Sequence, residues 1–286
     1  QIPWHPLMLA PDPEPDERAY AFLANLVYRR SRIRLGPDKR AFVAGRLAGR
    51  LRSLGLTSYD DYCRLLSPGN DEEAEQLVDL ISTNHTCFFR EPAHFEFLAR
   101  DLLPTACRRA AAEGRPLRVW CAAAASGEEA YSLAIVVAEH ARTGSLSGWG
   151  VDASDISRRM LDRCRLGVYE ADRVQLPDPA WLKRYFRRGF GERHGFYRVK
   201  PELRQRVQVT AINLFQPSYP LPAGQDVIFC RNVMIYFDEA SRQILVDRLS
   251  EQLAPGGHLF VGHAESLLGL THRLRQVQPA VYERPA

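Results

Sequence analysis

The chain has 286 residues and a mass of 32.4 kDa, with 45% hydrophobic residues, 25% charged residues and a formal net charge of +4. This balance is typical of a globular protein, and no apolar run approaches the roughly 18 residues of a membrane-spanning helix. The six cysteines lack the spacing of a zinc site or a redox pair. We therefore expect a cytoplasmic protein with reduced cysteines and no metal.

The first part of the chain is predicted to be helical. Residues 1–15 are rich in proline and should form an extended lead-in. Apolar side chains then recur at three-to-four spacing, which predicts an all-α N-terminal domain of four short helices over residues 16–82. Pro37 suits the start of the second helix and Gly55 its end.

The second helix lies in a strongly basic segment. Residues 29–52 contain nine lysines and arginines but one acid, Asp38. Such a cluster attracts an acidic partner, which could be nucleic acid, an anionic membrane or a glutamate-rich protein. Lys39, Arg46 and Arg50 fall near one stripe of the helix, although a solvated basic face would look the same.

From about residue 116, predicted strands alternate with predicted helices. This pattern favours an α/β fold with a doubly wound, mostly parallel sheet. A glycine-punctuated stretch between Tyr185 and Val199 predicts a β-hairpin inserted into the sheet domain. The expected strands are 117–120, 149–153, 207–212, 226–230 and 258–262, followed by an antiparallel C-terminal hairpin of 275–277 and 281–283.

Acidic side chains follow the first two strands of this sheet, where ligands of doubly wound folds bind. Small residues after the first strand, 121–127, would let a ligand approach the backbone, but they are not the glycine pattern of dinucleotide sites. Glu129 would suit a cationic or hydroxyl-bearing ligand, and Asp155 is placed like acids that bind ribose hydroxyls. Alternatively, Glu128 or Glu129 stabilises the helix dipole and Asp155 caps the following helix.

Five longer motifs occur in order along the chain. They are STNHTCFFRE (82–91), AAASGEEAYS (123–132), ASDI (153–156), FCRNVMIYFD (229–238) and GHAES (262–266). Together they resemble the chemotaxis receptor glutamate methyltransferases, the CheR family. The resemblance implies an N-terminal receptor-recognition domain and, over residues 83–286, a class I methyltransferase domain with a small β-subdomain inserted over about residues 172–205.

The resemblance also implies a reaction and its residues. The expected reaction moves a methyl group from S-adenosyl-L-methionine to glutamate carboxylates of chemoreceptors, giving methyl esters for sensory adaptation and S-adenosyl-L-homocysteine as product. Arg46 and Arg50 would bind receptor helices, and the β-subdomain could hold a receptor C-terminal tether peptide. Arg90 and Tyr236 would flank the methyl group. The cofactor-binding positions would be Asn84, Thr86, Arg90, Glu129, Asp155, Asn213, Leu214, Arg231 and Asn232.

Two other functions remain as alternatives. A nucleic-acid methyltransferase would use the basic cluster against phosphates, but its usual Asn/Asp-Pro-Pro-aromatic motif is replaced by Arg231-Asn-Val-Met. A non-catalytic binding module is the second, although Arg90 and Tyr236 argue against it. His258 and His263 lack metal-ligand spacing and are expected to be structural. No general base is needed, because a glutamate of pKa about 4.3 is already ionised near pH 7.

Overall fold

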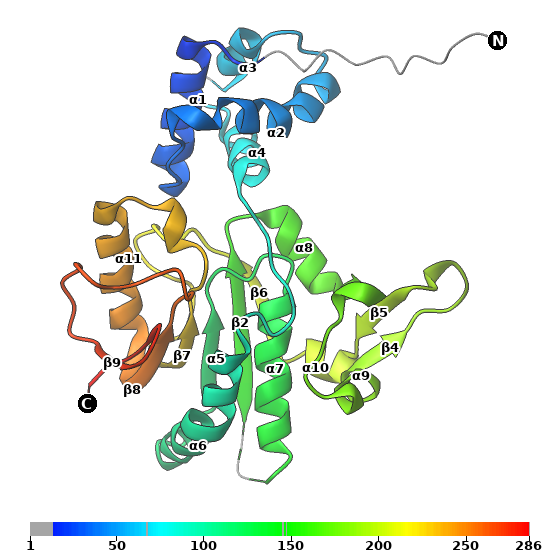
Figure 1. Cartoon of the computed structure of the whole chain (residues 1–286), viewed down its shortest axis with the longest axis vertical. Coiled ribbons are helices and arrows are strands. Elements are labelled where there is room, and N and C mark those ends of the chain that lie inside the picture. Colours follow the sequence, from blue (N-terminus) through cyan, green and yellow to red (C-terminus); the bar gives the residue numbers. More distant parts are fainter. Residues whose placement is uncertain (1–13, 67, 145, 147, 286) are drawn as a thin grey trace. The chain divides into compact units, whose positions relative to one another are not determined.

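The computed structural model describes residues 14–66, 68–144, 146 and 148–285, so nearly all of the predicted lead-in lies outside the described residues (Figure 1). The chain divides into two compact units, Gln1–Ser82 and Thr83–Ala286. Within the described residues, no helix is long and apolar enough to cross a membrane.

The first unit is all-α, as its periodicity predicts. Its helices are α1 (Glu17–Ser31), α2 (Arg40–Ser53), α3 (Tyr59–Leu65) and α4 (Asp71–Ile81), and a 3₁₀ turn at Pro37–Lys39 precedes α2. The side chains of Asp16, Ser58 and Asn70 cap α1, α3 and α4 by accepting backbone hydrogen bonds. The apolar faces meet in one core that includes Leu23 and Leu47.

The second unit is built on a seven-stranded sheet. Its strands are β1 (Leu117–Cys121), β2 (Trp149–Asp155), β6 (Val207–Ala211), β7 (Gln225–Phe229), β8 (Leu253–Phe260), β9 (Arg275–Gln278) and β10 (Val281–Glu283). The spatial order is β6-β2-β1-β7-β8-β10-β9. The first five strands are parallel, and β10 pairs antiparallel with both of its neighbours, β8 and β9. The doubly wound, mostly parallel sheet is thus confirmed, and its order reverses between β1 and β7.

Alternate residues of the central strand enter two separate cores. Val119 of β1 packs with the helix α7 (Glu128–Ala141), whereas Trp120 packs with α11 (Glu239–Gln252) on the opposite face. Both faces of the sheet are therefore covered, as is usual for parallel strands. Other helices that flank this sheet are α5 (Pro92–Phe97), a π-helical turn (Leu98–Leu102), α6 (Leu103–Ala112) and α8 (Arg158–Leu166).

One predicted boundary is wrong. The strand was expected over residues 258–262, but β8 begins earlier and includes the Pro-Gly-Gly of residues 255–257. A Cβ on Gly257 would lie 2.7 Å from the carbonyl oxygen of Gln225 in the neighbouring β7. The glycine allows this close approach at an irregularity in the β7–β8 pairing.

The inserted subdomain is a second, three-stranded antiparallel sheet. Its order is β3-β5-β4, formed by β3 (Val168–Glu170), β4 (Phe186–Arg188) and β5 (Phe196–Val199). The β4–β5 hairpin was predicted, but β3 was missed because a three-residue strand has too little alternation to recognise. Short helices α9 (Pro179–Tyr185) and α10 (Pro201–Arg204) flank the hairpin, which projects from the side of the domain (Figure 1).

Candidate functional site

The candidate site lies at the carboxyl ends of β1, β2 and β7, beside the point where the strand order reverses. The loop 122–127 connects β1 to α7 here, and backbone hydrogen bonds of 2.8 Å fasten Ala122 to Phe229 and Ala124 to Ser154. Gly127 has a φ of +97°, and a Cβ there would lie 2.5 Å from the Cys164 sulfur. Only glycine fits this position, so the loop stays close to the sheet.

Asp155 is the last residue of β2 and is buried. Its Oδ2 accepts a 2.9 Å hydrogen bond from the Ala125 N–H, and its Oδ1 accepts one of 2.9 Å from the Ser157 N–H. The cap of α8 is Ser157, so the alternative that Asp155 caps this helix is wrong. A carboxylate oxygen can accept more than one hydrogen bond, so these contacts are compatible with a further bond from a ligand hydroxyl.

Glu129 is the second acid of the site and lies in the first turn of α7. It is buried, and burial raises its pKa, an effect that the nearby guanidinium of Arg231 opposes. The Glu129 Oε2 lies 3.3 Å from Nη1 of Arg231, and its Oε1 accepts a 3.4 Å contact from the Cys121 thiol. A buried acid with a raised pKa is a good partner for a cationic ligand, whose charge would offset the cost of desolvation.

Arg231 connects this acid to the segment 83–91. Its side chain is fully buried, and its guanidinium carbon lies 5.6 and 5.4 Å from the ring centroids of Phe95 and Phe229. Its Nη2 donates a 2.5 Å hydrogen bond to the Arg90 carbonyl and forms a 3.1 Å ion pair with Glu91. Arg231 therefore anchors the segment that carries the predicted residues Asn84, Thr86 and Arg90.

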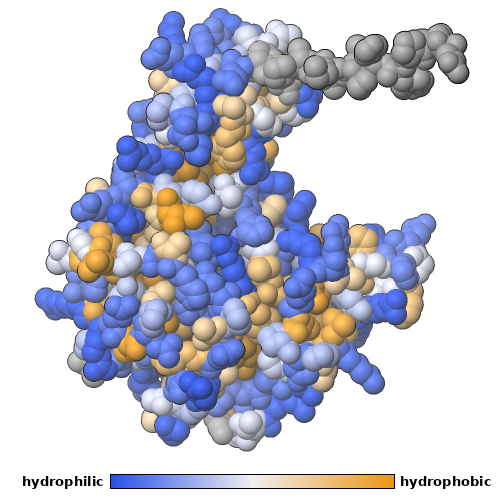
Figure 2. All heavy atoms as spheres, viewed as in Figure 1, coloured by the Kyte–Doolittle hydropathy of each residue, from blue (hydrophilic) through white to orange (hydrophobic). Residues whose placement is uncertain are grey.

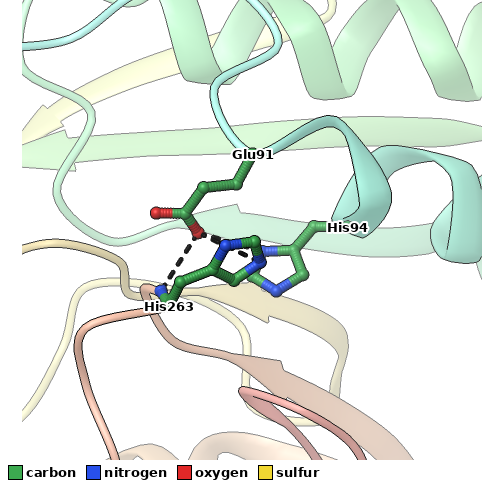
Figure 3. Close-up of side chains that lie close together, drawn as sticks. All are labelled: Glu91, His94 and His263. Atoms are coloured by element: carbon green, nitrogen blue, oxygen red, sulfur yellow. Dashed lines mark hydrogen bonds and ion pairs between the residues drawn. The ribbon is translucent and has the colours of Figure 1, made fainter.

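Glu91, His94 and His263 lie together below this segment, with possible ligand atoms within 4.8 Å of one another (Figure 3). Burial, reinforced by the charge of Arg231, lowers the pKa of His94 to about 4, so its imidazole is neutral near pH 7. The carboxylate of Glu91 already pairs with Arg231 and accepts a 3.2 Å hydrogen bond from the His263 N–H. Because Arg231 would repel a second cation, the geometry favours a structural contact over a metal centre.

Glu265 organises the loop after β7 that carries Asn232 and Tyr236. Its carboxylate accepts hydrogen bonds of 2.7 Å from the N–H groups of Asn232 and Met234, and one of 2.6 Å from Gly262. A Cβ on Gly262 would lie 2.4 Å from the Asn232 amide nitrogen, so the motif 262–266 needs its glycine as well as its acid. The motif is evident in the sequence, but nothing in its residues predicts this role of Glu265.

The other predicted positions of this unit lie at the same sheet edge. Arg90 is half-buried, and its Nη1 donates a 3.1 Å hydrogen bond to the His85 carbonyl. Asn213 and the buried Leu214 follow β6, and the Asn213 side chain accepts a 2.9 Å bond from the Phe215 N–H. The half-buried Tyr236 ends the turn Met234–Tyr236.

The two predicted receptor-binding arginines belong to the helical unit and have different surroundings. Arg50 is bound to the buried Glu73, with a 3.0 Å hydrogen bond from its Nε, and the Tyr62 hydroxyl donates to the same carboxylate at 2.8 Å. Arg46 instead lies over the Phe42 ring, 5.1 Å from its centroid. Arg50 therefore has a structural partner inside the unit.

Comparison with known proteins gives matches over nearly the whole chain. Residues 84–282 match the family "CheR methyltransferase, SAM binding domain", and residues 18–82 match "CheR methyltransferase, all-alpha domain". A chemotaxis protein methyltransferase of Escherichia coli K12 is 40% identical over 262 residues, which cover 91% of this chain and 88% of that protein. Chemotaxis protein methyltransferase 2 of Pseudomonas aeruginosa PAO1 is 42% identical over 260 residues, covering 90% and 89%.

A similar solved structure is the glycopeptide N-methyltransferase MtfA complexed with S-adenosylmethionine. Its TM-score is 0.33 and its sequence identity is 17%, over 63% of this chain and 58% of that chain.

Proposed function

The chain belongs to the CheR methyltransferase family of chemotaxis methyltransferases, and we propose that it methylates glutamate side chains of chemoreceptors with S-adenosylmethionine as donor. The observation that carries the proposal is the pair of buried acids, Glu129 and Asp155, beside the strand reversal of a chain that matches both family domains. The product would be a glutamate methyl ester that changes receptor signalling.

The residues of the site fit this cofactor. Adenosylmethionine carries an ammonium and a sulfonium cation, and Glu129 is a buried acid suited to offset positive charge. The Asp155 carboxylate would accept hydrogen bonds from the ribose hydroxyls. The further positions that we propose to line the cofactor site are Asn84, Thr86, Arg90, Asn213, Leu214, Arg231 and Asn232. When bound, S-adenosylmethionine supplies a methyl group that is activated by its attachment to a sulfonium.

The protein's own contribution to the reaction is positioning. A glutamate of the receptor with a pKa of about 4.3 is ionised at neutral pH, so the attacking oxygen needs no base. Arg90 would orient this carboxylate by a charge-assisted hydrogen bond, while leaving one oxygen free to attack. Tyr236 would donate a phenolic hydrogen bond that fixes the approach. Excluding water at this step strengthens both contacts.

The helical unit would recognise the glutamate-rich helices of the receptor through its basic surface. Hydrophilic side chains cover much of the visible face of this unit (Figure 2). Among the described residues, ion pairs within the unit occupy Arg30, Lys39 and Arg50. Arg46 has no such ion pair in this part of the chain and is the better candidate for contact with receptor carboxylates.

The inserted subdomain would hold a tether peptide at the receptor C-terminus. Its loop 188–195 presents Phe190, which is 79% exposed, between Arg188 and Arg193. An exposed aromatic ring between two cations suits a peptide that carries both an aromatic side chain and a carboxylate. A receptor-tail peptide should therefore bind the protein, and Phe190→Ala should weaken that binding.

The proposal is tested by incubating the protein with methyl-labelled S-adenosylmethionine and either chemoreceptor-containing membranes or DNA. Label on the receptor that depends on the protein supports the proposal. Label on the DNA alone would favour the nucleic-acid alternative, and cofactor binding without transfer to any of a panel of receptors would favour a binding module.

A further inference from the structure

The inserted subdomain contacts both segments that border the proposed cofactor site. From β3, the Tyr169 hydroxyl donates a 2.8 Å hydrogen bond to the Ser126 carbonyl in the loop 122–127. The Phe88 ring packs edge-on against Tyr169, at 5.0 Å between centroids, and against Phe186 of β4, at 5.7 Å. The subdomain is therefore fastened to the site as well as to the sheet.

Arg173 makes the polar part of this attachment. It ends the short 3₁₀ turn Ala171–Arg173 after β3. Its Nη2 donates a 2.5 Å hydrogen bond to Oε1 of Glu128 and a longer one, 3.4 Å, to the Thr86 carbonyl. One side chain of the subdomain thus contacts the start of α7 and the segment 83–91 together.

Glu128 has no access to solvent and depends on partners inside the protein. Burial raises its pKa, which is opposed by a hydrogen bond from Ser126, at 2.6 Å to Oε2, by a backbone hydrogen bond and by the charges of Arg173 and Arg163. Among the described residues, Arg173 is the cation that forms an ion pair with this carboxylate. Without it, the buried carboxylate of Glu128 would lose its ion-pair partner and would more readily take up a proton or admit water.

A change in the position or protonation of Glu128 would displace residues of the proposed cofactor site. The next residue is Glu129, the acid proposed to face the cofactor, and Ser126 is bound both to Glu128 and to Tyr169. Thr86, whose carbonyl Arg173 contacts, is itself a proposed cofactor-binding residue. Relaxation of these groups would therefore shift both borders of the site.

We propose that Arg173 is a positioning residue of the cofactor site, supplied by the inserted subdomain, which holds Glu128 and Thr86 in the geometry that binds S-adenosylmethionine. The inference rests on the proposed function, since it requires the cofactor to bind between these segments. Arg173 acts through Glu128 and Thr86 and has no part in methyl transfer.

The test is calorimetric titration of the full chain with S-adenosylhomocysteine. Arg173→Ala should weaken binding about tenfold, equivalent to about 1.4 kcal/mol, and raise the KM for S-adenosylmethionine while kcat stays near the original value. Arg173→Lys should restore most of the affinity because it keeps the charge. Adding Glu128→Gln to Arg173→Ala should also recover affinity, since the unpaired buried charge is then removed.

Arg187→Ala is the matched control, because Arg187 is an exposed arginine of β4 in the same subdomain. Equal affinity of the Arg173→Ala variant and the original protein would overturn the inference and leave the proposed function intact. Equal weakening by Arg187→Ala would overturn it too, since the effect would then be one of net charge. Failure of the unaltered protein to bind S-adenosylhomocysteine would contradict the proposed function itself.

Discussion

Oε2 of Glu265 accepts a 2.7 Å hydrogen bond from the backbone N–H of Asn232, and the two residues lie on loops that follow adjacent strands of the sheet. The same carboxylate binds Met234 and Gly262. Glu265 therefore fixes the path of the backbone that leads to Tyr236, the residue proposed to steer the substrate carboxylate.

Replacing Glu265 by Gln should lower kcat strongly and change the melting temperature little. A glutamine puts N–H donors where the loop needs acceptors, so the turn that carries Tyr236 loses its fixed position. We expect kcat to fall at least about tenfold, because small misplacements of reacting groups are costly. Steady-state kinetics beside thermal unfolding measures both effects. Glu251→Gln, an exposed acid of α11, is the control, and an unchanged kcat in Glu265→Gln would refute the role.

Tyr236→Phe and Arg90→Ala test the proposed substrate contacts. Each removes a hydrogen-bond donor near the transferring methyl group, so turnover should fall by about 10- to 100-fold. Affinity for S-adenosylhomocysteine should stay within about threefold for Tyr236→Phe, because the phenol is assigned to the substrate. Single-turnover kinetics and calorimetry separate the two quantities. Unchanged turnover in both variants would contradict these assignments.

Arg50→Ala should mainly lower stability, whereas Arg46→Ala should mainly raise the KM for receptor. Arg50 balances Glu73, whose side chain is only 6% exposed, so its loss should lower the free energy of unfolding of the helical unit by about 1–3 kcal/mol. Arg46 has an aromatic neighbour but no ion pair among the described residues, so its loss should raise the KM for receptor with little change in stability. Denaturant unfolding and receptor-dependent kinetics distinguish them. Equal effects of the two variants on both measurements would count against the distinction.

Stability should depend on His94 in mildly acidic solution. Burial lowers the folded-state pKa of His94 to about 4, below the 6.5 of an exposed histidine. The unfolded chain therefore binds the proton more readily, so stability is full above about pH 6.5 and is lost as the pH falls towards 4. The difference between the two pKa values corresponds to about 2–4 kcal/mol in the free energy of unfolding. The variant His94→Phe keeps an aromatic ring against Phe229 and Phe260. Its free energy of unfolding should therefore fall less between pH 6.5 and pH 4.5 than that of the original protein. The same pH dependence in both proteins would refute the shift.

The fold was predictable because its signals are local. The apolar spacing around Leu23 and Leu47 is that of helices, and the run 117–121 is apolar except for Arg118, in keeping with a strand that is covered on both faces. The helices between Pro92 and Ala112 were not assigned, and β3 was missed because three residues do not establish a pattern.

The site was predictable only in part. Glu129 and Asp155 could be identified because a small-residue loop and a strand end mark their positions. The partners of these residues come from distant segments: Arg231 reaches Glu91 across 140 residues of chain, and Arg173 reaches Glu128 across 45. No spacing rule connects such pairs. Arg50 shows the same limit, because its position on a basic stripe does not reveal the buried Glu73 beneath it.

The proposed function requires the methyl group to arrive on a glutamate carboxylate. The direct measurement is to label chemoreceptor-containing membranes with this protein and radiolabelled S-adenosylmethionine, treat the receptor with mild alkali and collect the volatile methanol. We expect the label to be released as methanol, since an ester is hydrolysed under these conditions, and we expect the rate of this labelling to fall about 10- to 100-fold in Arg90→Ala. Label that stays on the receptor after alkali would mean methylation of nitrogen or carbon and would contradict the proposed glutamate methylation.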